Sequence, residues 1–309
     1  MYRTFVIVRH TFREAIGQPI FTLLLALGAV VLLVFSALPF FTFGEDTIMF
    51  KSVGLDLILL LVLIATLFAT SKSIFEEIED RTMLTLMSKP IRKWEVLIGK
   101  YLGIVLAAAI AVAILGAVIM LCVWWRVPGD YQFNRRSLDE REIRQIFDTR
   151  LMPLAGLVPS LVLMWLQIAV LAAVSVAIST RVSLVVNLPV VIILYIAGNL
   201  TRFLFPISFG SAGSRTGPLA DSNFITKGVA YVLGNVVPFL ATFDLRNKTI
   251  HSKVALVGTI FARDPNAVPM SEIWGYTGVA FLYALAYATF ALAVGMLLFQ
   301  TRELGGGEG

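Results

Sequence analysis

The chain has 309 residues, of which 58% are hydrophobic and 15% are charged, and its formal net charge at pH 7 is +5. A soluble domain carries about 25% charged residues because its surface must stay wetted, so this composition excludes a soluble globular protein. The positive charge suits a surface of anionic lipid. A nucleic-acid interface would instead show a basic stripe with interleaved aromatic residues, and the sequence contains no such stripe, so we expect membrane lipid and no nucleic acid as a partner.

The chain begins with a segment, residues 1–19, that we predict to contain an interfacial helix over residues 2–16. Its apolar residues recur at helical spacing, namely Phe5, Val8, Phe12 and Ile16. Arg9 and Arg13 point elsewhere, which places them near lipid phosphates if the helix lies along the membrane surface. Pro19 follows and separates this helix from the next apolar run. The alternative is that the segment is only the flank of the first membrane span.

Six apolar runs follow, and each has about the 20 residues that a spanning helix needs. They cover about 20–39, 53–71, 98–125, 154–180, 184–205 and 274–299. Helices are favoured because bilayer hydrocarbon offers no partners to a bare backbone, and the runs lack the alternation of a transmembrane β-barrel. The sequence therefore predicts an all-α integral membrane protein, with six spans in a single transmembrane domain over residues 1–309.

Three polar segments separate these runs. Residues 72–97 carry acids first and bases later, with a turn predicted at Pro90 because proline disfavours helix in the residue before it. Residues 126–152 are predicted to hold a short amphipathic helix outside the membrane. Residues 206–273 include an apolar stretch, 224–243, that glycines and a proline interrupt. We interpret this stretch as a re-entrant or interfacial segment, with a seventh span as the alternative.

Six spans put both termini on the same side of the membrane. Three arginines and one acid precede the first span, and the first helix usually dominates orientation, so we predict that both termini are cytoplasmic. Most of the 25 lysines and arginines fall on the other side, but they lie in long segments that translocate largely regardless of charge. Residues 72–97 are then cytoplasmic, whereas 126–152 and 206–273 are extracytoplasmic.

Asp56 is the one acid within a predicted span. A carboxylate at mid-bilayer costs roughly 2.5–3.5 kcal/mol and often has a function. Because Asp56 lies near the start of its run, it either sits at the interface or contacts a substrate or ion. Tyr283 and Tyr287 in the last run either line a cavity or simply pack. We retain Asp56, Tyr283 and Tyr287 as candidates for a substrate path.

Other polar or small residues within the spans have simpler interpretations. Gln167, Asn187 and Asn199 are expected to form interhelical hydrogen bonds. In the last run a stripe of small residues is expected to allow close helix packing, namely Ala284, Ala288, Ala291 and Gly295.

Catalytic and metal-binding signatures are absent from the sequence. It contains no Gly-x-x-x-x-Gly-Lys-[Ser/Thr] phosphate loop and no Gly-x-Ser-x-Gly nucleophile motif. Cys122 is the only cysteine, and the two histidines, His10 and His251, lie in unrelated segments, so we expect no metal site and no cofactor bound by this chain. A transporter with this sequence is not itself an ATPase and must use another protein to hydrolyse ATP.

Residues 76–103 hold a series of acids, leucines, a Ser-x-Pro and a Gly-Lys at defined spacing, namely Glu77, Glu79, Thr82, Leu84, Leu86, Ser88, Pro90, Lys93, Glu95, Gly99 and Lys100. This series resembles the first cytoplasmic loop of type-2 ABC exporter permeases. That loop typically has an acidic start, Gly-Thr, several leucines, Ser-x-Pro, a basic residue, an acid and Gly-Lys. Arg81 replaces the usual glycine before the threonine.

The resemblance implies a bacterial cytoplasmic (inner) membrane and a dimer of permeases, either homodimer or heterodimer, with two separate ATP-binding subunits that hold ATP and Mg. It also implies that residues 82–89 form a coupling helix that docks on the ATPase. Leu84 and Leu86 would provide its apolar anchor, and the charged residues around them its polar rim. We assign ATPase coupling to Glu77, Glu79, Thr82, Leu84, Leu86, Ser88, Pro90, Lys93 and Glu95.

Two other classes of function remain open from the sequence. One is a non-transporting scaffold or assembly subunit that is coupled to an ATPase. The other is a membrane enzyme acting on lipid-linked substrates, which would need acids or histidines converging at one membrane face. The sequence does not identify a substrate.

Overall fold

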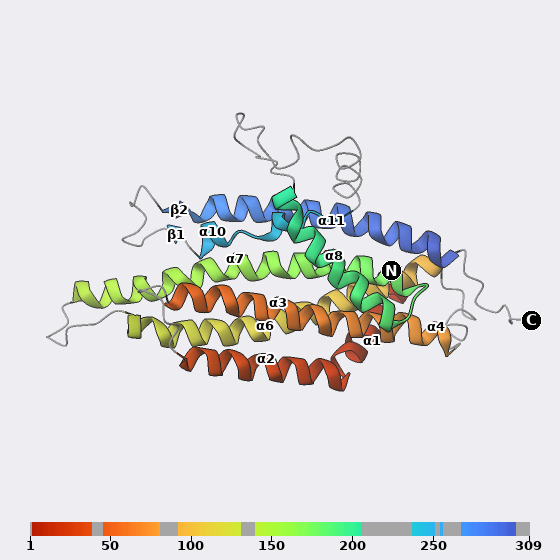
Figure 1. Ribbon diagram of the computed structural model, residues 1–309, viewed down its shortest axis with the longest axis horizontal. Coiled ribbons are helices and arrows are strands. Elements are labelled where there is room, and N and C mark those ends of the chain that lie inside the picture. Colours follow the sequence, from red (N-terminus) through yellow and green to blue (C-terminus); the bar gives the residue numbers. More distant parts are fainter. Residues whose placement is uncertain are drawn as a thin grey trace, which may run out of the picture.

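The structure is a computed structural model, and it describes residues 2–38, 46–80, 92–130, 140–204, 237–250, 254–255 and 267–300. Long helices lie side by side along the length of the molecule (Figure 1). Their sequences are apolar around most of each helix, so these helices suit lipid as their solvent. A helix also pairs its own backbone N–H and C=O groups, which lipid cannot do for it.

The N-terminal helix α1 spans Tyr2–Ile16, as predicted, and α2 spans Pro19–Ala37. The chain turns between them, where the Gly17 backbone N–H donates to the Arg13 carbonyl at 2.9 Å. Proline is well suited to the first turn of α2 because its missing N–H has no partner there in any helix. The helix α1 packs against the beginning of α6, so it is a separate element and not only the flank of a span.

The second predicted span is longer than its apolar run. Helix α3 (Asp46–Ser71) continues through a π-helix, η1 (Lys72–Glu76), into α4 (Glu77–Glu79). Helix α6 (Lys93–Asp130) likewise begins before its apolar run. Both ends of the predicted loop 72–97 are therefore helical, because their charged residues are good helix formers and neither end contains a proline.

Helix α7 (Glu140–Ser179) corrects the prediction for residues 126–152. The short helix expected there is continuous with the next span. Pro153 and Pro159 lie inside α7 without ending it, and each proline removes only one backbone hydrogen bond. The described part of α7 therefore extends the fourth predicted span by more than three turns.

The remaining elements form the C-terminal third of the chain. Helix α8 covers Leu184–Leu204, and a 3₁₀-helix, η2 (Leu240–Phe243), is followed by α10 (Arg246–Thr249). Two short strands, β1 (Val254–Ala255) and β2 (Val268–Pro269), pair in parallel with Val254 opposite Val268. Helix α11 (Met270–Gln300) is the last described element.

Five helices are long and apolar enough to cross a membrane. They are Pro19–Ala37, Thr47–Glu79, Lys93–Trp125, Pro153–Ser179 and Met270–Gln300. The apolar part of α8, Leu184–Asn199, is shorter, so the sixth span stays a prediction. Most of the stretch 224–243 lies outside the described residues, and its described end contains η2.

Helix α7 is the centre of the bundle and packs against α3, α6 and α11. Trp165 donates its indole N–H to the Val105 carbonyl of α6 at 3.1 Å, and the Tyr101 hydroxyl of α6 donates to the Ala169 carbonyl at 3.2 Å. A Cβ at Gly295 of α11 would lie 2.8 Å from the Ala177 Cα of α7. Close packing through the predicted small-residue stripe is thus confirmed.

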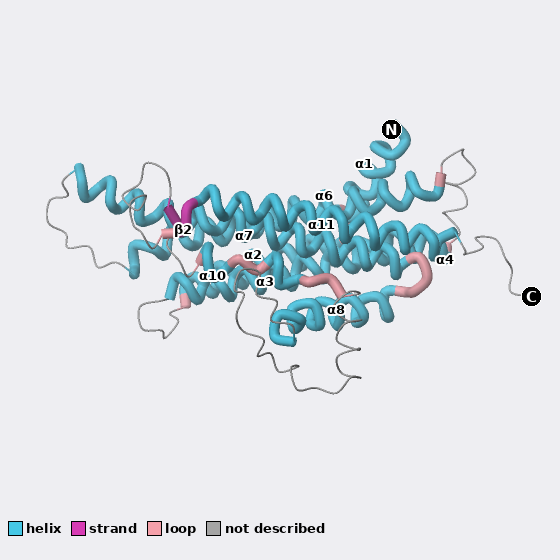
Figure 2. The backbone as a smooth tube through the Cα atoms, turned by 90° about the horizontal axis from the view of Figure 1, so that it is seen from above, coloured by secondary structure: helices cyan, strands magenta, loops and turns pink. Residues whose placement is uncertain are grey.

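The two ends of the bundle differ in their elements. One end, which we call the α4 end, carries α1, α4, the beginning of α6 and the end of α11 (Figures 1 and 2). The opposite end, the α10 end, carries α10 and the strand pair. Helix α8 crosses the outside of the bundle obliquely and contacts α3, α7 and η2.

Candidate functional site

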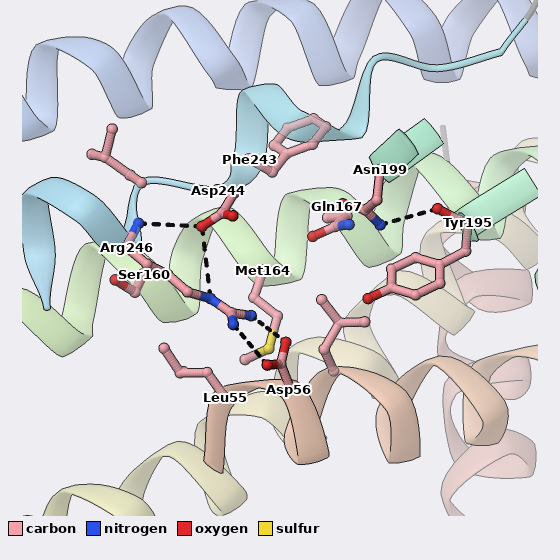
Figure 3. Close-up of a pocket in the computed structure, with 12 residues that line it drawn as sticks. Leu55, Asp56, Ser160, Met164, Gln167, Tyr195, Asn199, Phe243, Asp244 and Arg246 are labelled. Atoms are coloured by element: carbon pink, nitrogen blue, oxygen red, sulfur yellow. Dashed lines mark hydrogen bonds and ion pairs between the residues drawn. The ribbon is translucent and has the colours of Figure 1, made fainter. Parts of the chain in front are cut away.

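A polar pocket of about 250 Å³ lies between α3, α7, α8 and the η2–α10 segment (Figure 3). Its apolar wall includes Leu55, Leu59 and Met164. Its polar lining comprises Asp56, Ser160, Gln167, Tyr195, Asn199, Asp244 and Arg246. Four separate parts of the chain thus place polar side chains in one cavity of an otherwise apolar bundle.

Asp56 and Arg246 form a two-pronged ion pair across this pocket. Arg246 Nη2 donates to Asp56 Oδ1 at 2.6 Å, and Nη1 donates to Oδ2 at 2.8 Å. Such parallel hydrogen bonds fix geometry as well as charge. Burial lowers the pKa of Arg246, but the hydrogen bond and charge of Asp56 outweigh it, so this pKa lies above its ordinary value. The guanidinium therefore stays charged.

Asp244 is a second carboxylate beside Arg246. Its Oδ1 accepts the Arg246 backbone N–H at 3.3 Å and lies 3.7 Å from the side-chain Nε. The turn between η2 and α10 brings these two residues of one short segment together. The pocket therefore holds two carboxylates around one guanidinium.

Three polar residues predicted within separate spans meet at this pocket, namely Asp56, Gln167 and Asn199. The Asn199 Nδ2 donates to the Tyr195 carbonyl of its own helix at 3.0 Å, which contradicts the interhelical bond predicted for it. The Gln167 side chain forms no hydrogen bond with any residue that the structure describes, although the residue is only 6% exposed. It lies in the pocket wall (Figure 3).

Asn187 behaves as predicted. Its Nδ2 donates to the Ser175 and Ser179 hydroxyl oxygens of α7 at 2.8 and 3.0 Å. This interhelical contact fastens the beginning of α8 to the bundle and leaves the other end of α8 to line the pocket.

Tyr283 and Tyr287 do not line this pocket. The Tyr283 hydroxyl accepts the Phe239 backbone N–H at 2.8 Å, and its ring centroid lies 5.9 Å from that of Phe243 and 6.3 Å from that of Tyr287. Tyr283 thus packs behind Phe243, which itself lines the pocket. Of the three candidates for a substrate path, only Asp56 reaches this cavity.

Sequence reasoning missed the part of the site contributed by residues 237–250. This segment falls in 206–273, which the sequence predicts to be extracytoplasmic with a re-entrant or interfacial stretch at 224–243. Asp244 and Arg246, two opposite charges directly after an apolar stretch, were the only available signal. Nothing in the sequence pairs them with Asp56, 190 residues away.

A second group of charged residues joins α1, α4 and α6 at the α4 end. Lys100 of α6 is only 2% exposed, and its Nζ lies 2.6 Å from Glu77 Oε2. The same ammonium donates to the backbone carbonyl of Ser73 within η1, and its distance to the Ser73 hydroxyl is 3.3 Å. The preceding residue, Gly99, lets α1 approach, since a Cβ there would lie 2.8 Å from Ile7 Cγ2.

These two residues are the Gly-Lys of the pattern recognised in the sequence, and the comparison with known families agrees with it. The family model described as ABC-2 family transporter protein matches residues 34–304. The chain belongs to this family. No curated protein sequence matches the chain significantly. An ABC-2 permease is a membrane component of an ABC transporter and not itself an ATPase, and the family implies association with an ABC ATP-binding subunit. With its five apolar helices, this permease is an integral membrane protein.

Four of the nine assigned coupling residues of this permease are described. Glu77 pairs with Lys100, and Glu79 is exposed. Lys93 Nζ lies 5.3 Å from the Phe299 ring centroid of α11, and Glu95 Oε2 accepts the Arg92 backbone N–H at 3.2 Å, which caps α6. The other five lie outside the described residues, namely Thr82, Leu84, Leu86, Ser88 and Pro90.

Helix α1 of the permease turns an unexpected face to the bundle. Its buried residues are Ile7, Thr11 and Ala15, whereas Phe5 of the predicted apolar face is 64% exposed. Arg9 and Arg13 are also exposed. An apolar side chain and arginines that both point away from the protein suit a helix between protein and lipid.

Among the residues that the structure describes, no three His, Cys, Asp or Glu side chains are grouped to hold a metal ion.

Proposed function

We propose that this ABC-2 permease is the transmembrane subunit of an ATP-driven exporter that works with a separate ATP-binding subunit holding ATP and Mg. The family match supports the permease role. The observation that carries the coupling proposal is the Lys100–Glu77 pair, because it joins the two helical stretches on either side of residues 81–91 at one end of the bundle.

In this proposal residues 82–89 form a coupling helix that inserts Leu84 and Leu86 into a groove of the ATPase. A force applied there passes into both α4 and α6, since Lys100 links them, and into α1 through the close contact at Gly99. Packed helices respond to such a force by switching between discrete arrangements. That switching is the movement that would carry a substrate across the membrane.

The assembly that we propose contains a second permease, either a second copy or a related chain, and six spans per chain with α8 as the fifth. Both termini are then cytoplasmic, and the α4 end faces the ATPase. Helices α2 and α11 support an arrangement in lipid because they expose apolar side chains along much of their length, among them Leu23, Val30, Leu282 and Leu297.

The test of the ATPase partner is purification of the tagged chain from its native membrane in mild detergent, with mass spectrometry of the proteins that accompany it. We expect a soluble subunit with a phosphate-loop motif, crosslinked to residues 82–95. The Leu84→Asp, Leu86→Asp double variant should insert normally and lose this subunit. The control is Lys72→Glu, which changes charge at an exposed position outside the proposed helix. Unchanged ATPase association in the double variant would contradict the docking proposal.

A scaffold subunit would also retain an ATPase, so a second experiment separates it from an exporter. The complex is reconstituted in vesicles with fluorescent lipid and peptide cargoes, and ATP is added on the ATPase side. ATP-dependent loss of cargo from that side supports export.

A further inference from the structure

The pocket at Asp56 has an excess of negative charge. Two carboxylates, Asp56 and Asp244, surround a single guanidinium, that of Arg246. The donors of Arg246 are directed at these carboxylates, with two hydrogen bonds to Asp56 and the Nε toward Asp244. An anionic ligand would have to break this pair to reach Arg246, and it would face two like charges.

Three groups in the cavity wall offer hydrogen-bond acceptors, namely the carboxylates of Asp56 and Asp244 and the amide oxygen of Gln167. The Asp56 side chain is 57% exposed even while it binds Arg246, and a carboxylate accepts more than two hydrogen bonds. Gln167 is only 6% exposed and lies in the pocket wall, and its amide forms no hydrogen bond with the described part of the chain. Its amide oxygen can therefore accept a hydrogen bond from a ligand in the cavity.

Two aromatic rings complete the lining, those of Tyr195 and Phe243. An aromatic face attracts a cation by its quadrupole. The volume of about 250 Å³ is below the range of roughly 300–1,000 Å³ typical of sites for drug-sized ligands. The cavity therefore suits a small group and not a bulky molecule.

We propose that this pocket binds a primary ammonium group, with Asp56 and the Gln167 carbonyl oxygen as acceptors of its N–H bonds. A primary ammonium has three donors and no acceptor, which complements this lining. A quaternary ammonium has the same charge without any donor. The group belongs either to a soluble amine or to the headgroup of an ethanolamine lipid, and the same contacts serve both.

This site deepens the proposed function, since a ligand at the α10 end would be a substrate or an effector of the permease. Its test is independent of transport and of the ATPase. Absence of any ATPase subunit from the purified unmodified complex would contradict the exporter proposal and leave ligand binding intact, whereas absence of ligand binding would overturn this inference and leave the exporter proposal standing.

The experiment measures binding of radiolabelled ethanolamine to the full chain in nanodiscs of phosphatidylcholine by equilibrium dialysis, with choline as the quaternary comparison. In a second arm, native mass spectrometry compares retention of phosphatidylethanolamine and phosphatidylcholine. We expect saturable ethanolamine binding that is about tenfold tighter than choline binding, equivalent to about 1.4 kcal/mol. Tighter retention of the lipid alone would assign the ammonium group to a headgroup, and binding of ethanolamine alone would assign it to a soluble amine.

Three variants locate the site. Gln167→Met removes one acceptor with little change in volume and keeps every charge, and Asp56→Asn removes the carboxylate charge. Each should weaken binding about tenfold. The control is Glu272→Gln at the same end of the bundle, where Glu272 pairs with Lys248 at 2.5 Å outside the pocket, and it should bind like the unmodified protein.

Because Asp56→Asn also frees Arg246 and risks misfolding, Gln167→Met is the deciding variant. No saturable binding in either arm, equal binding of primary and quaternary ammonium, or full affinity in folded Gln167→Met would overturn the proposal.

Discussion

The ammonium of Lys100 in α6 lies 2.6 Å from the carboxylate of Glu77 in α4, and it also donates to the Ser73 carbonyl inside the π-helix η1. A π-helix spaces its backbone hydrogen bonds by five residues, and such turns often occur at functional sites. Here the altered spacing coincides with a carbonyl that accepts a side-chain donor. The chain is thus fastened to the bundle just before and just after residues 81–91.

Replacing Glu77 tests how much this contact stabilises the protein. Glu77→Gln leaves the Lys100 charge almost fully buried without its carboxylate, and breaking a buried ion pair in this way is strongly destabilising. We expect a loss of up to about 3 kcal/mol, because Glu77 itself is 25% exposed and part of the pair is screened. The measurement is thermal unfolding in detergent, followed by tryptophan fluorescence.

Glu79→Gln is the matched control, since Glu79 is an exposed acid two residues away. Its effect should stay within about 0.5 kcal/mol. Equal unfolding temperatures for the two variants would contradict a structural role for the Lys100–Glu77 pair.

Gly103 is a second position at which α1 approaches α6 closely. A Cβ there would lie 2.8 Å from Thr11 Cβ and 2.9 Å from the Val8 carbonyl oxygen, and the backbone of α1 has no rotamer that relieves this contact. Gly103→Ala should therefore displace α1 and cost about 1–3 kcal/mol. Limited proteolysis should show faster cleavage within residues 2–16.

Gly278 in α11 provides the comparison, because a Cβ there meets nothing within 4 Å. Alanine is the better helix former by up to about 1 kcal/mol, so Gly278→Ala should be neutral or slightly stabilising, with α1 as resistant to protease as before. Slower or unchanged cleavage in Gly103→Ala would refute the packing argument.

The apolar runs of this chain were predictable because each is a local signal. The helices α2, α3, α6, α7 and α11 each cover most or all of one predicted run, and α1 has the bounds that its periodicity predicts. The ends of the spans were less predictable. Charged residues, which are good helix formers, extend α3 and α6 beyond their apolar runs, and prolines do not stop α7 because each removes only one backbone hydrogen bond.

The candidate pocket was only half predictable. Asp56, Gln167 and Asn199 stood out because polar residues are costly in apolar helices. Their convergence, and the contribution of Arg246, depend on how α8 and the η2–α10 segment fold back on α3 and α7. No periodicity encodes a contact between residues 190 positions apart.

Arg246 should hold the η2–α10 segment against α3. Arg246→Met removes two charge-assisted hydrogen bonds to Asp56. We expect a loss of about 1–2 kcal/mol, toward the lower end for bonds to charged groups, since the Asp56 side chain is 57% exposed. Limited proteolysis in detergent should show faster cleavage within residues 237–250 in this variant.

Lys248→Met is the control, because the Lys248–Glu272 pair has both side chains about half exposed. Such surface pairs contribute about 0–1 kcal/mol. Cleavage at the unmodified rate in Arg246→Met would show that the segment is held by other contacts.

Glu14 of α1 should make stability depend on pH. Its side chain is 24% exposed, and its Oε2 forms no hydrogen bond within the described residues. Burial raises its pKa above the ordinary value of 4.5, although Lys100 opposes this effect. The folded protein then holds a proton that the unfolded chain releases, so the contribution of Glu14 to stability decreases as the pH rises from about 4.5 through the raised pKa.

Glu14→Gln should remove this decrease and unfold at a higher temperature than the unmodified protein at pH 8, with the difference vanishing near pH 4. Glu76→Gln, at an exposed acid on η1, is the control for the loss of one acid and should unfold at about the temperature of the unmodified protein at pH 8. A Glu14→Gln protein that is less stable at pH 8 would mean that the Glu14 carboxylate is held by the charge of Lys100 and not penalised by burial.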